Sequence, residues 1–452
     1  MNISESISRR SFLGKSALAG AAALSFPHIA LSKEQLKLRV AVIGLGRRSD
    51  YAFRSLRPDQ VEITALCDVD TRTFSQAVDK RRMDVPPTEL WPQAKRFEDY
   101  RELFEYPDLY DAVWIATPDH HHFPAAIRAI RAGKAVYCEK PLTWSVWESQ
   151  QLADEARKYE VATQLGNQGM GNQGWRVGRT YYEAGVLGDI VEVHTFTGSR
   201  LARRTSEIQG EDPIPEYLNW DLWQGPVQER PYVNDIYTPF EWRKIPEFGN
   251  GALGDWCCHL MNGFYKILEP GYPSSVECVK QVDPEARTFA EGSEIRYEYP
   301  AKDGRPGFVS TWYNGAAQPP RPAALEADRE LGGPGCYLVG TKGTLWLKGG
   351  YVESPRLIPE SFRREVGRME SIVPRSHHVE DFIRAAKGVS AYDAPLSHFG
   401  YGGVLTAGAL LGNIASRFEG KLDYDAATRR FTNIEAANEW LQRKNPRPGW
   451  YV

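Results

Sequence analysis

The sequence has few cysteines, no long hydrophobic run in its body and no excess of charge of either sign. Its 452 residues include only 6 cysteines and carry a formal net charge of −3, with 55 basic against 58 acidic side chains. This balance argues against a nucleic acid or a membrane surface as partner. The cysteines match no paired C-x-x-C spacing, so we predict no metal site. We find no internal repeat or low-complexity segment.

The overall composition is typical of a soluble globular protein with more than one domain. Of its residues, 42% are hydrophobic and 25% are charged. At about 100–200 residues per domain, the length predicts two or three domains. Cys67 and Cys138 end predicted strands, and Cys257 and Cys258 are adjacent on a predicted helix. We therefore expect the cysteines to be buried and free rather than paired in disulfides.

The N-terminus has the order of features found in export signals. Arg9 and Arg10 precede Phe12 and an apolar run of small residues over 17–31. The run is too short and too weakly hydrophobic for a transmembrane helix. We predict a twin-arginine signal peptide over residues 1–32, recognised by the Tat export machinery, and a periplasmic mature protein without a stable membrane anchor. The alternative is an ordinary N-terminal extension.

Strands alternate with helices over residues 33–165. Short β-branched runs are separated by helical stretches, of which one has Pro124 in its first turn and another begins at Ser145. This alternation predicts an α/β domain with a doubly wound parallel sheet. The expected strands are LRVAVIG, VEITALCD, YDAVWIATP, AVYCEKP and VATQLGN.

The pattern changes near residue 165. Glycine, proline and tryptophan become dense over residues 166–256, and alternating runs such as SSVECVKQV, EIRYEYP and CYLVGTKGTLWLK follow. Successive strands with few helices between them predict an antiparallel sheet. We expect residues 166–452 to form an α+β domain with a largely antiparallel open sheet, which binds the substrate and forms the oligomer.

A glycine-rich turn follows the first strand. Gly44 and Gly46 lie where a chain can approach a pyrophosphate, with Ser49 in the place of a third glycine. Asp68 ends the second strand, where a carboxylate binds a ribose diol and repels a 2′-phosphate, so NAD is favoured. Arg72 keeps NADP open, and capping of the helix that begins near Thr71 is the alternative role of Asp68.

Two further motifs follow later strands of the parallel sheet. In TPDHHH, Pro118 shapes a loop at the expected ligand edge, and diverging histidines make a metal site less favoured than capping or lining the cleft. In CEKPL, Lys140 ends a strand at the same edge, where it can bind or transfer a proton; a surface lysine is the alternative. The expected cofactor contacts are Gly44, Gly46, Arg47, Arg48, Ser49, Asp68, Thr117, Pro118, His122, Glu139 and Lys140.

The stretch GNGALGDWCCH carries an acid and a base on one predicted helix. Asp255 and His259 are four residues apart, which places them on one helix face. An imidazole beside a carboxylate can accept an alcohol proton. An ordinary contact on the helix surface is the alternative.

Together, the glycine-rich turn, EKP and GNGALGDWCCH resemble the Gfo/Idh/MocA family, which includes glucose-fructose oxidoreductases and inositol dehydrogenases. The resemblance implies a Rossmann domain, a second domain whose open sheet often forms a homodimer or homotetramer interface, and NAD(P) at their junction. It also implies that Lys140, Asp255 and His259 are catalytic, with Asp255 orienting the imidazole. Ser49 in place of the third glycine is a departure from the pattern.

Tryptophans suggest the kind of substrate. Several fall in the segment that leads into GNGALGDWCCH, where flat rings suit the C–H faces of sugars; ordinary core packing is the alternative. The expected substrate contacts are Lys140, Asn167, Trp175, Arg176, Trp242, Asp255, Trp256 and His259.

The family resemblance implies hydride transfer at a hydroxyl-bearing carbon of a sugar, glycoside or cyclitol. We expect tightly bound NAD, because an exported protein meets no NAD pool. An NAD-dependent glycosidase that works by transient oxidation is the alternative, followed by a non-catalytic binding protein.

Overall fold

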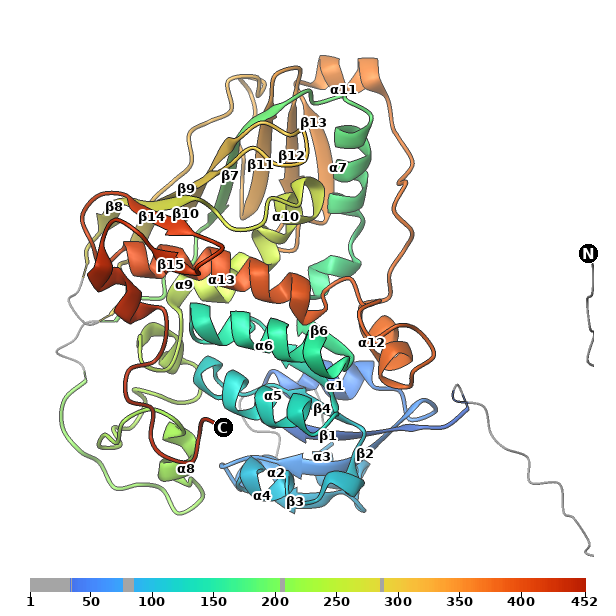
Figure 1. Ribbon diagram of the computed structural model, residues 1–452, viewed down its shortest axis with the longest axis vertical. Helices are drawn as coiled ribbons and strands as arrows, with labels where there is room; N and C mark the ends of the chain where they lie inside the picture. The colour runs from blue at the N-terminus through green and yellow to red at the C-terminus, as the bar shows by residue number, and fades with distance from the viewer. Residues whose placement is uncertain (1–32, 34, 76–84, 204–207, 285–287) are drawn as a thin grey trace, which may run out of the picture.

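The computed structural model describes residues 33, 35–75, 85–203, 208–284 and 288–452. The predicted signal peptide over 1–32 lies outside these residues. Two sheets organise the described chain, and they occupy opposite ends of the molecule in Figure 1. Helices fill the space between them. The predicted combination of an α/β domain with an α+β domain is confirmed.

A six-stranded parallel sheet forms the N-terminal part, in the order β3-β2-β1-β4-β5-β6. The predicted strands are all present, and a further edge strand, β3, was missed because it has three residues of which two are exposed. The strands are β1 (Leu38–Ile43), β2 (Val61–Cys67), β3 (Lys95–Phe97), β4 (Ala112–Ile115), β5 (Ala135–Glu139) and β6 (Thr163–Gly166).

Two long helices cover one face of this sheet, and local sequence signals fix their ends. In α6 (Val146–Tyr159), Ser145 and Glu148 form a reciprocal capping box. In α5 (His122–Arg131), Pro124 occupies the first turn, and Gly133 follows with a φ of 70°. The other helices of this part are α1 (Ser49–Ser55), α2 (Arg72–Ser75), α3 (Pro87–Leu90), α4 (Tyr100–Leu103), η1 (Pro107–Leu109) and η2 (Asp119–His121).

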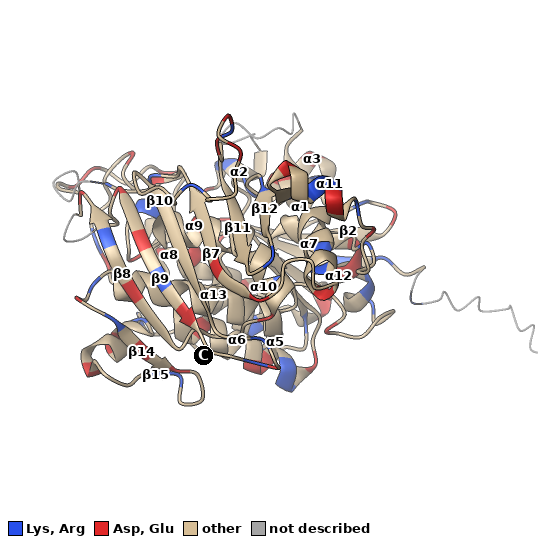
Figure 2. Ribbon diagram, turned by 90° about the horizontal axis from the view of Figure 1, so that it is seen from above, with Lys and Arg blue, Asp and Glu red and all other residues tan. Residues whose placement is uncertain are grey.

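The second sheet has nine strands in the order β13-β12-β11-β7-β10-β9-β8-β14-β15. Among the described strands of this sheet, only β7 and β10 pair in parallel; the other pairs are antiparallel, and β11 and β12 form the predicted hairpin. Figure 2 looks onto the face of this sheet that lies away from the helices. The strands are β7 (Ile190–Thr197), β8 (Ser275–Val282), β9 (Gly292–Tyr299), β10 (Phe308–Gly315), β11 (Gly335–Gly340), β12 (Thr344–Lys348), β13 (Ser354–Ile358), β14 (Leu422–Asp425) and β15 (Arg430–Phe431).

Helix α13 (Phe399–Ala415) lies between the two sheets and packs on α6 and α9 (Gly251–Leu260). A Cβ at Gly403 would lie 2.8 Å from the Ser149 carbonyl oxygen, so glycine permits the close approach of α13 to α6. None of the described helices is long and apolar enough to span a bilayer. The remaining helices are η3 (Gln168–Gly171), α7 (Gln173–Glu183), α8 (Trp220–Gln224), η5 (Glu241–Lys244), α9 (Gly251–Leu260), α10 (Asn262–Leu268), α11 (Glu360–Val366), α12 (His378–Ala386) and η6 (Glu435–Trp440).

The core is continuous across both parts of the chain. One cluster joins α5 and α6 to α9, α13 and the inner face of the nine-stranded sheet. A second cluster covers the other face of the parallel sheet, where Phe382 and Ile383 of α12 pack with Val40 and Trp114. The chain after residue 166 therefore contributes to the N-terminal core, and the two sheets hold the loops between them in fixed positions.

Candidate active site

The site lies where the strand order of the parallel sheet changes direction, between β1 and β4. Open α/β sheets bind ligands at this point, beyond the carboxyl ends of the strands. Gly44, directly after β1, has a φ of 87°, and a Cβ there would lie 2.7 Å from the Ala116 carbonyl carbon. Only glycine fits this close approach. A Cβ at Gly46 would meet no atom within 4 Å, so open space adjoins the second glycine.

Asp68 braces this glycine loop from the end of β2. Its Oδ2 accepts the Leu45 N–H at 2.6 Å, and its Oδ1 accepts the Asp70 N–H at 2.9 Å. The carboxylate is thus placed where sequence analysis predicts a ribose contact, which stays a prediction. Arg72, which kept NADP open, pairs with Asp70 at 2.7 Å and lies over the Tyr217 ring.

The loop residues fit a dinucleotide. In the described part of the chain, the backbone N–H groups of Gly46, Arg47 and Arg48 donate no hydrogen bond. The buried Thr117 Oγ1 after β4 likewise has no partner among the described residues. Free donors beside open space are what a pyrophosphate needs. Ser49 replaces the third glycine at little cost, because its hydroxyl donates to the Gly46 carbonyl oxygen at 2.7 Å.

Arg48 and Glu139 form an ion pair across the same edge, with 2.8 Å between Nε and Oε2. Burial raises the pKa of Glu139, although the Arg48 guanidinium opposes this shift. Both side chains were predicted to contact the cofactor; the structure pairs them with each other, and the cofactor contact stays a prediction. Arg47, by contrast, is exposed.

The three consecutive histidines are buried and bonded to backbone carbonyls. The His122 ring lies between two loops, with Nδ1 2.8 Å from the Pro141 oxygen and Nε2 3.0 Å from the Thr117 oxygen, and the neutral ring donates to one of these two oxygens. His120 and His121 both approach the Trp223 carbonyl oxygen, at 2.9 and 2.8 Å. Burial lowers the pKa of His121 and His122 to about 4, so both are neutral near pH 7. Every ring nitrogen of the three lies beside a protein oxygen, so these side chains fix the loops after β4 and β5; the predicted cofactor contact of His122 stays a prediction.

Lys140 and Asp255 form the central ion pair. The Lys140 Nζ lies 2.6 Å from Asp255 Oδ1 and 2.7 Å from the Asp255 backbone oxygen. Arg243 Nε donates to the same Oδ1 at 3.3 Å, and its guanidinium lies over the rings of Phe240 and Trp242. Burial opposes ionisation of Asp255, but Lys140 and Arg243 outweigh it and hold the pKa of this carboxyl below its ordinary value.

His259 lies one helical turn beyond Asp255 but is not hydrogen-bonded to it; the described partners of Asp255 are Lys140 and Arg243. The expected direct orientation of the imidazole by Asp255 is therefore absent from this geometry. The ring packs edge-on to Tyr351, with 4.6 Å between centroids, and its Nδ1 has no partner among the described residues. Burial, followed by the charges of Lys140 and Arg48, lowers its pKa well below the ordinary value. His259 is thus a neutral imidazole with an unused nitrogen.

The other expected substrate contacts are mostly occupied. The Asn167 amide donates to the Cys258 oxygen and Asn262 Oδ1 and accepts the Ser397 hydroxyl, so all its bonds are internal. Trp175 and Trp242 are 2% and 5% exposed. These positions differ from the predicted sugar-stacking surface, because the rings are used in packing.

Arg176 is also buried, at 2% exposure, and bonds to the Met170 oxygen at 3.4 Å. Trp256 is half-buried beside His259, with 6.4 Å between ring centroids, and remains available to a ligand. The structure thus brings Lys140, Asp255, Trp256 and His259 together, and gives Asn167, Trp175, Arg176 and Trp242 supporting roles.

Three residues at the site were not predicted. Arg243 comes from the tryptophan-rich segment and Tyr351 from the turn after β12. Asp119 lies inside the histidine motif, next to the predicted Pro118. Asp119 could have been found from its place after a strand at the ligand edge. The other two are brought in by long-range packing, which no local pattern signals.

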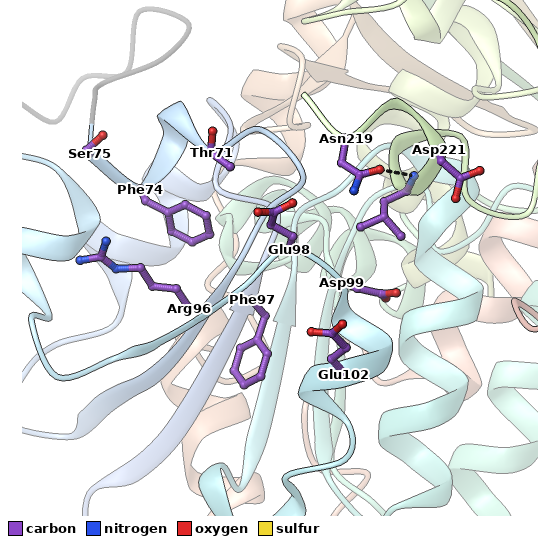
Figure 3. Close-up of a pocket in the computed structure, with 11 residues that line it drawn as sticks. Thr71, Phe74, Ser75, Arg96, Phe97, Glu98, Asp99, Glu102, Asn219 and Asp221 are labelled. Carbon is purple, nitrogen blue, oxygen red and sulfur yellow. Dashed lines mark hydrogen bonds between the residues drawn. The ribbon is translucent and has the colours of Figure 1, made fainter. Parts of the chain in front are cut away.

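A separate cavity of about 840 Å³ opens at the ends of β2 and β3, and Figure 3 shows its lining. Glu98, Asp99 and Glu102 lie on one side and Asp221 of α8 on the other. None of its lining residues belongs to the Lys140–Asp255 pair. The buried pair and the neighbouring His259 are the candidate site, because a carboxylate, an ammonium group and an imidazole meet there.

Fold and site together define a chain with a dinucleotide-binding type of parallel sheet, a second, mostly antiparallel sheet, and a buried lysine–aspartate pair at the ligand edge of the first sheet. Residues 38–167 match the family model described as "Oxidoreductase family, NAD-binding Rossmann fold", GFO_IDH_MocA. The match and the relatives below make residues 38–167 similar to the NAD-binding Rossmann domain of the Gfo/Idh/MocA family, and they support NAD as the cofactor of this part of the chain.

Curated relatives are similar over the N-terminal part. A glycosyl hydrolase family 109 protein from Stenotrophomonas maltophilia is 35% identical over 133 residues, which are 29% of each chain. A levoglucosan dehydrogenase from Pseudarthrobacter phenanthrenivorans is 27% identical over 165 residues, 36% of this chain and 34% of that protein. These alignments thus span about a third of the relatives' own length.

Solved structures are similar over most of the chain. The WlbA dehydrogenase of Bordetella pertussis, solved with NADH and UDP-GlcNAcA, has a TM-score of 0.58 and 16% identity, covering 86% of this chain and 99% of that one. At this identity the likeness concerns the fold, and it extends to the second domain, which the family model does not reach.

Proposed function

We propose that the protein is an NAD-dependent oxidoreductase that acts on a hydroxyl-bearing carbon of a sugar, glycoside or cyclitol. The observation that carries this proposal is the buried Lys140–Asp255 pair, 2.6 Å long, with neutral His259 beside it at the ligand edge of an NAD-binding domain. The named activities of relatives, such as levoglucosan dehydrogenase and inositol 2-dehydrogenase, support the substrate class.

The glycine loop would hold the cofactor through the N–H groups of Gly46 and Arg47, with Asp68 at the ribose. When bound, the nicotinamide supplies the hydride acceptor or donor. Lys140 can donate a hydrogen bond to the substrate oxygen and so keep a proton beside that atom. Asp255 and Arg243 fix the ammonium in place.

His259 offers a second proton site. Its pKa lies well below the ordinary value, so the ring is neutral near pH 7 and can accept a hydrogen bond from a hydroxyl. Tyr351 and Trp256 flank the ring and shield it from water. This arrangement suits proton transfer from a secondary alcohol as its carbon is oxidised.

The test is hydride transfer between a panel of cyclitols, aldoses and glycosides and the bound cofactor, followed by nicotinamide absorbance. We expect reduction of NAD with at least one polyol and a strong loss in His259→Asn, with cofactor still bound. Bound cofactor that no polyol reduces would contradict the proposal. Release of an aglycone without net redox change would point to the glycosidase chemistry named by the family 109 relatives.

We further propose twin-arginine export to the periplasm with NAD already bound, and assembly into a homodimer or homotetramer. Arg9 and Arg10 before an apolar run support the export, and the open nine-stranded sheet, whose face away from the helices is seen in Figure 2, supports the assembly. Replacing both arginines by lysine should keep a tagged protein in the cytoplasm. Light scattering should give the mass of two or four chains. Unchanged export of the double-lysine variant would contradict the twin-arginine route, and the mass of one chain would contradict the assembly.

A further inference from the structure

Asp119 is a buried carboxyl group in the loop after β4, at the ligand edge of the parallel sheet. It follows Thr117 and Pro118 after β4, and it is 4% exposed. Its Oδ2 accepts a hydrogen bond from the Asn250 amide at 3.2 Å. Among the described residues, no lysine or arginine forms an ion pair with it. A buried carboxylate without a cation contact is costly, so this group needs an explanation.

Asn250 connects Asp119 to the catalytic helix. It immediately precedes α9, and its backbone oxygen accepts the Gly254 N–H and the Asn413 amide, both at 3.1 Å. A Cβ at residue 254 would lie 2.2 Å from the Asn250 Cβ, so Gly254 lets the asparagine lie against the first turn of the helix. The Asp119–Asn250 bond therefore ties the loop after β4 to the helix that carries Asp255 and His259.

Asp119 also shares an electrostatic environment with the central pair. The charged groups that face it are Arg243 from η5, Lys140 from the end of β5 and Asp255 from α9. The histidines of its own segment, His120, His121 and His122, are buried and neutral near pH 7. Burial raises the pKa of Asp119 to about 7, against the opposing effect of Arg243, Asn250 and Lys140. Asp255, in direct contact with two cations, stays ionised, whereas Asp119 can change its charge near neutral pH.

We propose that Asp119 is a positioning residue of the reaction site. Through Asn250 it holds α9, the helix that carries Asp255 and His259, against the loop after β4, and its ionisation sets the charge around the Lys140–Asp255 pair. With Asp119 neutral, Lys140 and Arg243 face one carboxylate; with Asp119 ionised, they face two. The ammonium then holds its proton more firmly, and transfer of that proton becomes slower. The kinetic consequence rests on the proposed oxidoreductase function.

The test uses Asp119→Asn, which keeps an oxygen for the Asn250 amide but cannot ionise. Infrared difference titration of the full-length protein should show a carboxylic acid signal that disappears as the pH rises through about 7, and that is missing in the variant. The hydride-transfer rate of the wild type should change over the same pH range. In the variant this step should be absent, with KM changed less than about twofold. Asp111→Asn, at the other end of β4, is the matched control and should keep both features.

A wild-type protein without the acid signal, or a variant that keeps the step in rate, would overturn the proposal. If no substrate is oxidised at all, the infrared titration still decides the ionisation of Asp119, so failure of the proposed function is separately visible. If Asp119→Asn does not fold, Asn250→Ser provides the second test. Removing the amide donor should move the acid signal to higher pH, and an unmoved signal would overturn the proposal.

Discussion

The Lys140 ammonium lies 2.6 Å from Asp255 Oδ1, across the boundary between the parallel sheet and the helix α9. The residues are 115 positions apart in the chain, and both are largely buried, with side chains 12% and 18% exposed. A buried pair of this kind is costly to assemble and costly to break on one side. Its position at the ligand edge is the basis on which we propose that it serves the reaction.

Replacing Lys140 by alanine tests this role. We expect the hydride-transfer rate to fall by about 10²- to 10⁴-fold, because the proton donor and acceptor at the substrate oxygen is lost. Cofactor affinity should change little, since the glycine loop is intact. Lys134→Ala, just before the same strand, is the matched control and should retain full activity. Equal rates for both variants would show that Lys140 has no part in the chemistry.

The two glycines of the loop should respond differently to alanine. At Gly46 a Cβ meets open space, so Gly46→Ala should fold normally but lose at least about tenfold in NAD affinity, because the methyl group occupies the place of the pyrophosphate. At Gly44 the methyl would collide with Ala116, so Gly44→Ala should lower the melting temperature as well. Calorimetry for binding and thermal denaturation for stability separate the two effects. Unchanged NAD affinity in Gly46→Ala would place the cofactor elsewhere.

Asp68→Asn should relax the preference for NAD over NADP. The asparagine oxygen can still accept the Leu45 N–H, which keeps the loop in place, but the charge that repels a 2′-phosphate is gone. We expect the ratio of the two dissociation constants to shift by about tenfold or more towards NADP. Direct titration with both nucleotides measures this ratio. An unchanged ratio would mean that Asp68 serves only to brace the loop.

The buried histidines predict a loss of stability in mild acid. His121 and His122 have folded-state pKa values of about 4, below the ordinary value of 6.5, so below pH 6.5 the unfolded chain binds protons that the folded chain does not. Their stabilising contribution is complete above about pH 6.5 and is lost as the pH falls towards 4, by up to about 3 kcal/mol for each.

Thermal denaturation as a function of pH checks this. His122→Gln should be less stable at pH 7 but should lose less on acidification than the wild type. His377→Gln, which changes an exposed histidine, should follow the wild-type curve. A wild-type melting temperature that is constant between pH 7 and pH 5 would contradict the burial of neutral histidines.

Much of the fold was predictable because it depends on local patterns. The β-branched runs, Pro124, and the Ser145 cap fix the parallel sheet and its helices, and the turn at Thr341–Gly343 fixes the hairpin of the second domain. The edge strand β3 was not predicted, because a strand of three residues, two of them exposed, is too short to show an alternation of buried and exposed side chains. The order of the nine-stranded sheet likewise depends on long-range pairing.

The site was predictable in part. Lys140, Asp255 and His259 belong to short motifs, and the structure brings them together as expected. The partners of these residues were not predictable: Asp255 bonds to Lys140 and Arg243, and the imidazole lies against Tyr351. Composition cannot separate a tryptophan ring that faces a cleft from one that fills the interior. Trp175, which was predicted to contact the substrate, fills the interior.

The most direct test of the account is transfer of deuterium from a carbon-deuterated polyol to the nicotinamide of the bound cofactor, followed by mass spectrometry of the nucleotide released on denaturation. We predict one added deuterium with the wild type for at least one cyclitol, aldose or glycoside, and at least about 10²-fold slower labelling with Lys140→Ala, although that variant still holds the nucleotide. Released NAD that never gains deuterium with any member of the panel would contradict an oxidoreductase and leave a protein that binds its cofactor without using it.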